Sequence, residues 1–118
     1  MGAAALKWAA MPNLHKVQAQ DRANQLYTLV TALPRPPAGH AALAEQLRQA
    51  VTTIRANVAL AVNHADPPQL YGVARASAVQ CAAHIDCYRF LRAIEPQQYE
   101  AAMALLSPLV AALTKLAR

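Results

Sequence analysis

Apolar residues recur every three or four positions along most of the chain, and polar residues separate them. This spacing places the apolar side chains on one face of a helix, where they can pack against other helices. No run alternates apolar and polar residues for long enough to predict a half-buried strand. The predicted core positions are Ala19, Ala23, Leu26, Val30 and Leu33 in a first helix, Leu43, Leu47, Ala50, Ile54 and Ala61 in a second, Leu70, Ala74, Ser77, Cys81, His84, Tyr88 and Leu91 in a third, and Tyr99, Met103, Leu106, Val110, Leu113 and Ala117 in a fourth.

Prolines separate the four predicted helices. The breaks lie at residues 33–39, 64–68 and 94–96. We expect Asp66 to cap the third helix with Pro67 at its first position, and Pro96 to open the fourth, because the first turn of a helix leaves its N–H groups unpaired anyway. The short connections make consecutive helices antiparallel neighbours.

Length and composition agree with a single helical domain. The chain has 118 residues, of which 56% are hydrophobic and only 3 are glycine, and alanine, the strongest helix former, is its most frequent residue. The predicted fold is an all-α, antiparallel up-down-up-down four-helix bundle over residues 13–118. Residues 1–12 are predicted to form an N-terminal tail.

One segment of the second helix is apolar beyond the predicted core stripe. Leu60 and Val62 lie off the stripe that contains Ile54 and Ala61. A small bundle covers only one stripe of each helix, and a helix that is apolar all round is buried all round. We therefore predict that the chain is a homo-oligomer and that Leu60 and Val62 lie at the interface between subunits.

The chain carries a formal net charge of +5, which attracts nucleic acid or an acidic protein surface. Arg48 and Arg55 are seven residues apart on the second helix, whereas Arg75 and Arg89 are fourteen apart on the third, with Arg92 one turn further. These five arginines are predicted to form a basic strip that contacts nucleic-acid phosphates without reading bases. The alternative is that they are solvated and serve to offset the dipole at helix ends.

Two polar residues fall on predicted core stripes. Asn57 is expected to be structural, because a buried amide can fix the register and association state of helices. The alternative for Asn57 is a hydrogen bond to a neighbouring backbone carbonyl with no further role. His84 is expected to be a core histidine whose ring nitrogen has a hydrogen-bond partner.

Metal binding and catalysis have little support in the sequence. Cys81 and His84 share a helical face, but zinc needs roughly two more ligands, and no second Cys/His pair has ligand spacing. Asp86 points to a different side of the helix from His84, so a nucleophile, base and orienting carboxylate do not line up. The sequence therefore predicts no metal, no cofactor and no catalytic residue.

The sequence also gives expectations about the compartment. No uninterrupted apolar stretch approaches the roughly 20 residues of a membrane span, and the first residues lack the basic leader of a secretory signal. Cys81 and Cys87 lie about 120° apart around a helix and cannot bridge each other. Two free thiols are typical of a reducing compartment. We predict a cytoplasmic protein with no membrane partner.

The second helix carries a recognisable motif, Gln46-Leu47-Arg48-Gln49-Ala50-Val51-Thr52-Thr53-Ile54-Arg55-Ala56-Asn57-Val58-Ala59. This segment resembles the motif of the bacterial four helix bundle protein family, which includes proteins encoded in intervening sequences of large-subunit ribosomal RNA and the accessory variability protein of diversity-generating retroelements. Weaker matches occur at residues 27–34, 73–77 and 99–100. The chain departs from the usual family residues at Gln49, Leu60 and Gln80.

The resemblance implies a four-helix protomer that assembles into a ring-like homopentamer. For the retroelement branch it also implies binding to a reverse transcriptase and to nucleic acid, RNA or DNA, through a basic surface. The predicted function is therefore a non-catalytic oligomeric scaffold that binds nucleic acid, a nucleic-acid-handling protein such as a reverse transcriptase, or both. The alternative is a purely protein–protein interaction or structural module that binds no nucleic acid.

Overall fold

The computed structural model describes residues 14–118, and all regular secondary structure in this range is helical. The helices are α2 (Leu14–Thr31), α3 (Ala41–Ala61), α4 (Pro67–Phe90) and α5 (Pro96–Leu116). The prediction of an all-α fold with four helices is confirmed. The predicted tail over residues 1–12 lies outside the described residues.

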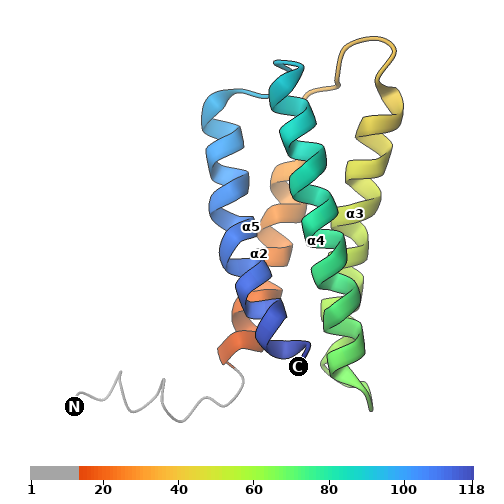
Figure 1. Ribbon diagram of the computed structural model, residues 1–118, viewed down its shortest axis with the longest axis vertical. Helices are drawn as coiled ribbons and strands as arrows, with labels where there is room; N and C mark the ends of the chain where they lie inside the picture. The colour runs from red at the N-terminus through yellow and green to blue at the C-terminus, as the bar shows by residue number, and fades with distance from the viewer. Residues whose placement is uncertain (1–13) are drawn as a thin grey trace, which may run out of the picture.

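The four helices pack side by side in a closed arrangement (Figure 1). α2 packs on α3, α3 on α4, α4 on α5, and α5 back on α2, and the most extensive of these interfaces joins α3 and α4. Each adjacent pair of helices therefore forms one outer face of the bundle. The α2·α3 face lies opposite the α4·α5 face, and the α3·α4 face joins these two.

The helix boundaries follow the prolines, although their capping differs from the expectation. Pro67 and Pro96 stand in the first turn of α4 and α5. Asp66 occupies the N-cap position of α4 with Pro67 next to it, as expected, but its side chain makes no capping hydrogen bond. The backbone N–H of Asp66 instead donates to Nδ1 of His64 at 3.0 Å. At α5 the Glu95 carboxylate and the Gln98 side chain form a reciprocal capping box.

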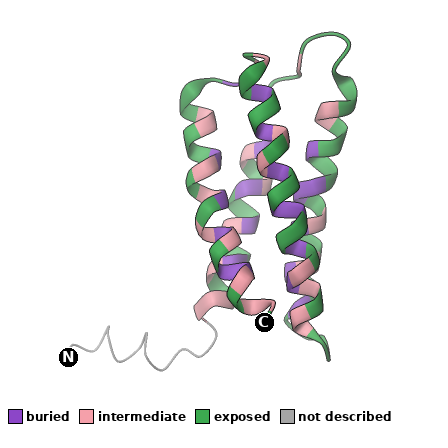
Figure 2. Ribbon diagram, viewed as in Figure 1, coloured by how far each residue is buried: buried purple, intermediate pink, exposed green. Residues whose placement is uncertain are grey.

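The core is made of one inward stripe on each helix (Figure 2). The predicted stripes of α2 and α3 are buried as expected, apart from the terminal residues Leu33 and Leu43, which are half-buried. Val51 and Val58 join the stripe of α3. Periodicity alone therefore identifies the inner side of these two helices.

The stripes of α4 and α5 match the predicted ones only in part. The predicted core residues that are buried are Ala74, Ser77, Cys81 and Tyr88 in α4 and Leu106 and Leu113 in α5. In α4, Tyr71 and Ile85 are buried. The residues that precede them, Leu70 and His84, are only half-buried, and so is Leu91. In α5 the buried residues are Ala102, Leu106, Leu109, Ala112 and Leu113, and the predicted core residues Tyr99, Met103, Val110 and Ala117 are half-buried. Both helices are apolar around much of their circumference, so the apolar spacing is satisfied by more than one stripe and packing decides between them.

Helix α5 is long and apolar enough to cross a membrane by length and composition. The core helix of a small bundle meets the same criteria, and α5 contributes five residues to the buried core. The two neighbours on which α5 packs, α2 and α4, bury 28% of its apolar 18-residue window.

One buried polar group in the core has no hydrogen-bond partner among the described residues, the hydroxyl of Tyr71. The side chain is 1% exposed, and burial raises the pKa of the hydroxyl, so the group is neutral. An unpaired buried hydroxyl costs free energy because it has lost its hydration without replacement.

We predict that Tyr71→Phe leaves the free energy of unfolding unchanged or raises it by up to about 1 kcal/mol, because the substitution removes only the unpaired hydroxyl. Chemical denaturation of the variant and the wild type measures the difference. Tyr99→Phe is the contrasting variant, because the Tyr99 hydroxyl donates to Asp86 at 2.8 Å and its removal should cost about 0.5–1 kcal/mol. A loss above about 1 kcal/mol in Tyr71→Phe would show that the hydroxyl has a partner.

Candidate functional site

The α2·α3 face holds a fixed arginine. The Nε–H of Arg55 on α3 donates to Oδ1 of Asn24 on α2 at 3.0 Å, and its guanidinium carbon lies 4.7 Å from the centroid of the Tyr27 ring. These residues line a groove of about 370 Å³ that also includes Gln20 and Thr52, and no carboxylate lines it. The groove therefore presents a guanidinium that neighbouring side chains hold in place and that no described carboxylate pairs.

Two further arginines lie near the beginning of α3. Arg48 forms an exposed ion pair with Glu45, in which its Nε–H donates to Oε2 at 3.1 Å and a terminal N–H donates to Oε1. The hydrogen bond from Arg48 lowers the pKa of Glu45 and raises that of Arg48. Arg35, from the connection between α2 and α3, lines a hollow together with Glu45 and Arg48. Sequence spacing missed Arg35 because only the folded connection brings it beside α3.

The arginines of α4 face the opposite side of the bundle. The Nε–H of Arg75 donates to Oγ1 of Thr114 on α5 at 2.8 Å, and the guanidinium carbon of Arg89 lies 4.4 Å from the centroid of the Tyr99 ring. Arg89 and Arg92 line a hollow whose other residues include Glu95 and Glu100. Carboxylates therefore stand beside Arg89 and Arg92.

The five predicted arginines thus do not form one basic strip. Arg48 and Arg55 belong to α3 and stand on its α2 side, whereas Arg75 and Arg89 belong to α4 and stand on its α5 side. The reason is that α3 and α4 both turn their apolar stripes inward, so the flanks that carry arginine point away from each other. The structure forms two arginine grooves on opposite faces.

Arg92 has an unusual backbone conformation. Its φ is +55°, and it is the only non-glycine residue with positive φ among residues 14–118. The N–H of Ala93 donates to the Tyr88 carbonyl at 2.9 Å and that of Arg92 to the Arg89 carbonyl at 3.0 Å, which is the hydrogen-bond pattern of a Schellman motif. Glycine usually occupies this position because a β-carbon is strained there.

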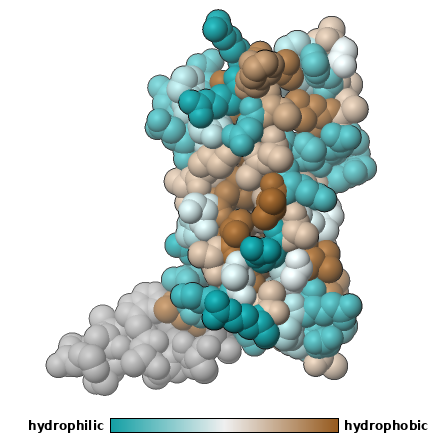
Figure 3. Space-filling view, in the orientation of Figure 1, coloured by the Kyte–Doolittle hydropathy of each residue, from teal (hydrophilic) through white to brown (hydrophobic). Residues whose placement is uncertain are grey.

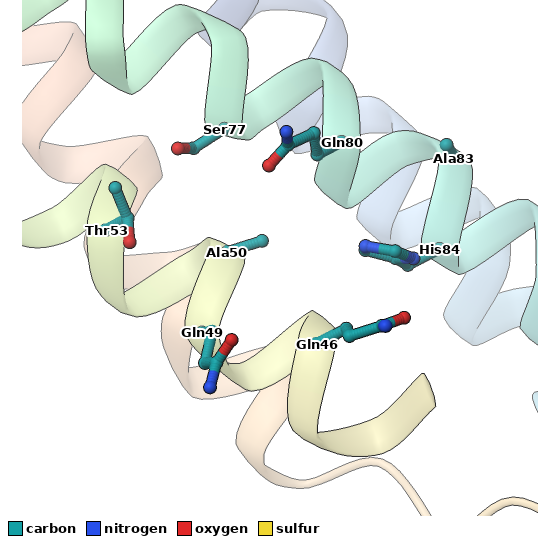
Figure 4. A pocket seen from close by; sticks show the side chains of 8 residues that line it. All are labelled: Gln46, Gln49, Ala50, Thr53, Ser77, Gln80, Ala83 and His84. Atoms are coloured by element: carbon teal, nitrogen blue, oxygen red, sulfur yellow. The ribbon is translucent and has the colours of Figure 1, made fainter. Parts of the chain in front are cut away.

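The third face, between α3 and α4, contains a neutral polar groove (Figure 4). Its volume is about 430 Å³. The polar side chains that line it are Gln46, Gln49 and Thr53 from α3 and Ser77, Gln80 and His84 from α4. None of them is an arginine, lysine or carboxylate, so this groove offers hydrogen bonds without charge.

The two polar residues predicted to be structural lie at the edge of this face. His84 is half-buried and points into the groove, so the prediction of a core histidine is wrong (Figure 4). Asn57 is half-buried, and its Nδ2 donates to the Thr53 carbonyl at 2.9 Å. The Asn57 amide therefore makes the local backbone bond considered as its alternative, and a role in helix register stays a prediction.

The two cysteines have different environments. Cys81 is buried in the core, and burial raises its pKa to about 12. Cys87 is exposed. His84 lines the groove outside the core that contains Cys81, so these two do not form a nucleophile–base pair. Within the described part of the chain, no group of three or more His, Cys, Asp or Glu side chains could hold a metal ion.

Large apolar side chains are exposed on the outside of the bundle. Leu60 is 61% and Val62 is 53% exposed, which agrees with their position off the core stripe. Three further large apolar residues on α4 are exposed and were not expected from the sequence: Val73, Val79 and Phe90. They are exposed because a helix that is apolar on several sides leaves some of its apolar residues outside.

Comparisons with known proteins add no assignment: no family model and no curated protein matches the chain. The resemblance to the four helix bundle protein family therefore stays a prediction that rests on residues 46–59 and the weaker matches around them.

We predict that one of the two thiols reacts in the native protein. At concentrations low enough to keep the chain a monomer, the exposed Cys87 should react with a disulfide reagent within minutes, whereas the buried Cys81 should resist because its thiolate is scarcely populated at neutral pH. Thiol titration before and after denaturation counts the reactive thiols in the native and in the unfolded protein. Two rapidly reacting thiols in the native state would contradict the burial of Cys81, and Cys87→Ser is the control that should leave none.

We predict that Arg92→Gly raises the free energy of unfolding by about 1 kcal/mol, because glycine adopts positive φ without strain. Arg92→Ala is the matched control, since it removes the same charge and keeps the β-carbon. The comparison uses denaturant unfolding at equal pH and salt. Equal stability of the two variants would show that the left-handed conformation of residue 92 is not strained.

Proposed function

We propose that this chain is a non-catalytic binding scaffold whose α2·α3 face contacts the phosphate backbone of nucleic acid. The observation that carries the proposal is Arg55, which Asn24 and Tyr27 hold over a groove without a carboxylate. An arginine that is already oriented loses little side-chain entropy when it binds a phosphate. Arg35 extends this basic surface toward the beginning of α3, where Arg48 is paired with Glu45.

The overall charge supports the same partner. The chain has 11 basic and 6 acidic residues, and Arg48–Glu45 is the one ion pair found among residues 14–118. Most cations are therefore not neutralised within the described part of the chain and can interact with a polyanion. The α4·α5 groove is the weaker candidate, because Asp86, Glu95 and Glu100 stand near its arginines.

The remaining parts of the proposal follow from the sequence. The four helices run up-down-up-down and antiparallel, in agreement with their short connections. The chain is a cytoplasmic homo-oligomer, a pentamer by resemblance, with Leu60 and Val62 at a subunit interface. A reverse transcriptase or another nucleic-acid-handling protein is the protein partner that the resemblance implies. The burial and raised pKa of Cys81 argue against this thiol as a nucleophile.

A protein–protein module without nucleic-acid binding is the second candidate. The neutral α3·α4 face favours it, because the centres of protein interfaces are depleted of charged residues. In this case the exposed arginines serve solubility and helix ends. Binding of generic duplex RNA or DNA at low salt separates the two candidates.

We predict that the wild type binds a duplex at low salt and that affinity falls steeply as salt rises. Arg55→Gln should weaken binding several-fold and lower the slope of log affinity against log salt by about 1, because one phosphate contact is lost. Arg75→Gln on the opposite face is the control with the same change of charge and should have a smaller effect.

Fluorescence anisotropy with a labelled duplex of mixed sequence measures both quantities. Absence of binding at low salt would eliminate nucleic acid as the partner. Equal effects of Arg55→Gln and Arg75→Gln would show that the contact does not lie on the α2·α3 face.

A further inference from the structure

The only phenylalanine of the chain lies almost entirely outside the core. Phe90, at the end of α4, is 87% exposed, more than any other large apolar residue among those described. A phenyl ring gains most of its stabilising free energy from burial, because it removes a large apolar area from water. Phe90 makes little use of that gain within its own chain.

An apolar hollow lies directly beside Phe90. Its volume is about 490 Å³, and Leu43 from α3 lines it together with Cys87, Phe90 and Leu91 from the end of α4. His40 and Asp86 stand at its rim, where the Tyr99 hydroxyl donates to the Asp86 carboxylate. Hydrophobic residues gather over this end of α4 on the surface of the molecule (Figure 3). The protein thus carries an apolar projection and an apolar hollow next to each other.

The hollow continues into a surface that carries no formal charge. The neutral groove of Gln46, Gln49, Gln80 and His84 lies along the same pair of helices, and Ala76 and Ala83 are exposed on α4 beside it. Apart from Asp86 at the rim, the charged residues of α3 lie on its α2 side and those of α4 lie on its α5 side. A surface without charge can be buried in an interface without the cost of desolvating ions.

The partner that fits this surface best is a second copy of the chain. A two-fold axis that runs along the face, parallel to the helices, would place each Phe90 beside the hollow of the other copy, because the projection and the hollow lie at the same end of each chain. Glutamine amides both donate and accept, so a row of them can pair with the same row on a copy. Two molecules that each carry a charge of +5 repel each other least where neither presents a cation. A polyanion would instead be attracted to the arginine grooves.

The size of the face is sufficient for a specific contact. Helix α4 has 24 residues and is about 36 Å long, and two adjacent helices are about 20 Å wide, so the face covers on the order of 700 Å². A standard protein interface buries about 800 Å² on each partner.

We propose that two copies of this chain join through their α3·α4 faces, with Phe90 of each copy inserted into the hollow beside Leu43, Cys87 and Leu91 of the other. This inference rests on the homo-oligomeric part of the proposed function and adds a second contact surface to the interface predicted at Leu60 and Val62. A two-fold contact requires an even number of chains, so the ring of five implied by the resemblance is compatible with it only where two such rings are joined through these faces.

Light scattering coupled to size-exclusion chromatography, over a range of micromolar concentrations, tests the proposal. The wild type should contain an even number of chains, and Phe90→Ala should weaken association by about 30-fold or more, as expected for an aromatic residue at the centre of an interface. Ala83→Glu should also dissociate the pair, because it places a carboxylate in the neutral face. Thermal unfolding should show that both variants remain folded, since both residues are exposed in the single chain.

Val17→Ala truncates another exposed apolar residue on α2, and Ala101→Glu adds the same charge to an exposed position on α5. Both control variants should form an assembly with the same number of chains as the wild type. A wild-type monomer at every concentration would overturn the proposal together with the homo-oligomeric part of the proposed function. A wild-type assembly of odd number, or one that Phe90→Ala and Ala83→Glu leave intact, would overturn the two-fold contact alone.

Discussion

Burial of one apolar stripe on each helix fixes the rotation of that helix about its axis, and the position of every surface residue follows from that rotation. On α3 the stripe around Leu47, Ile54 and Val58 faces inward. This orientation turns Arg55 toward α2 and Gln46 toward α4. The hydrophobic effect, which has no preferred direction of its own, thereby determines which polar groups share a face.

The result is a separation of surface types around the bundle. Arginines stand in the α2·α3 and α4·α5 grooves, and neutral amides and apolar side chains occupy the α3·α4 face. Association of two copies through the neutral face leaves both arginine grooves at the surface of the pair. Self-association and phosphate contact therefore need not compete, although both involve α3.

The sequence predicts the helices and the inner sides of α2 and α3, where nearly all the apolar residues at three- and four-residue spacing are buried. It predicts only part of the stripe of α4, because Val73, Val79 and Phe90 extend the apolar character of that helix beyond its buried side. The division of the arginines could not be predicted either, since it depends on which helices are neighbours. Arg35 lies in a connection, where helical spacing carries no information about position.

The capping residues also show that residue type alone does not determine which contacts form. Asp66 has the residue type of an N-cap but makes no capping hydrogen bond, whereas the Glu95 and Gln98 side chains form a full capping box. Residue type gives the preference for a position, and the path of the preceding connection decides whether the side chain can reach the free N–H groups.

The separation of the two surfaces is tested most directly by the mass of the wild-type chain mixed with a short duplex at low salt. We expect one complex in which the assembled protein keeps its number of chains and binds the duplex. Release of single chains when the duplex binds would contradict it, because the two partners would then compete for one surface.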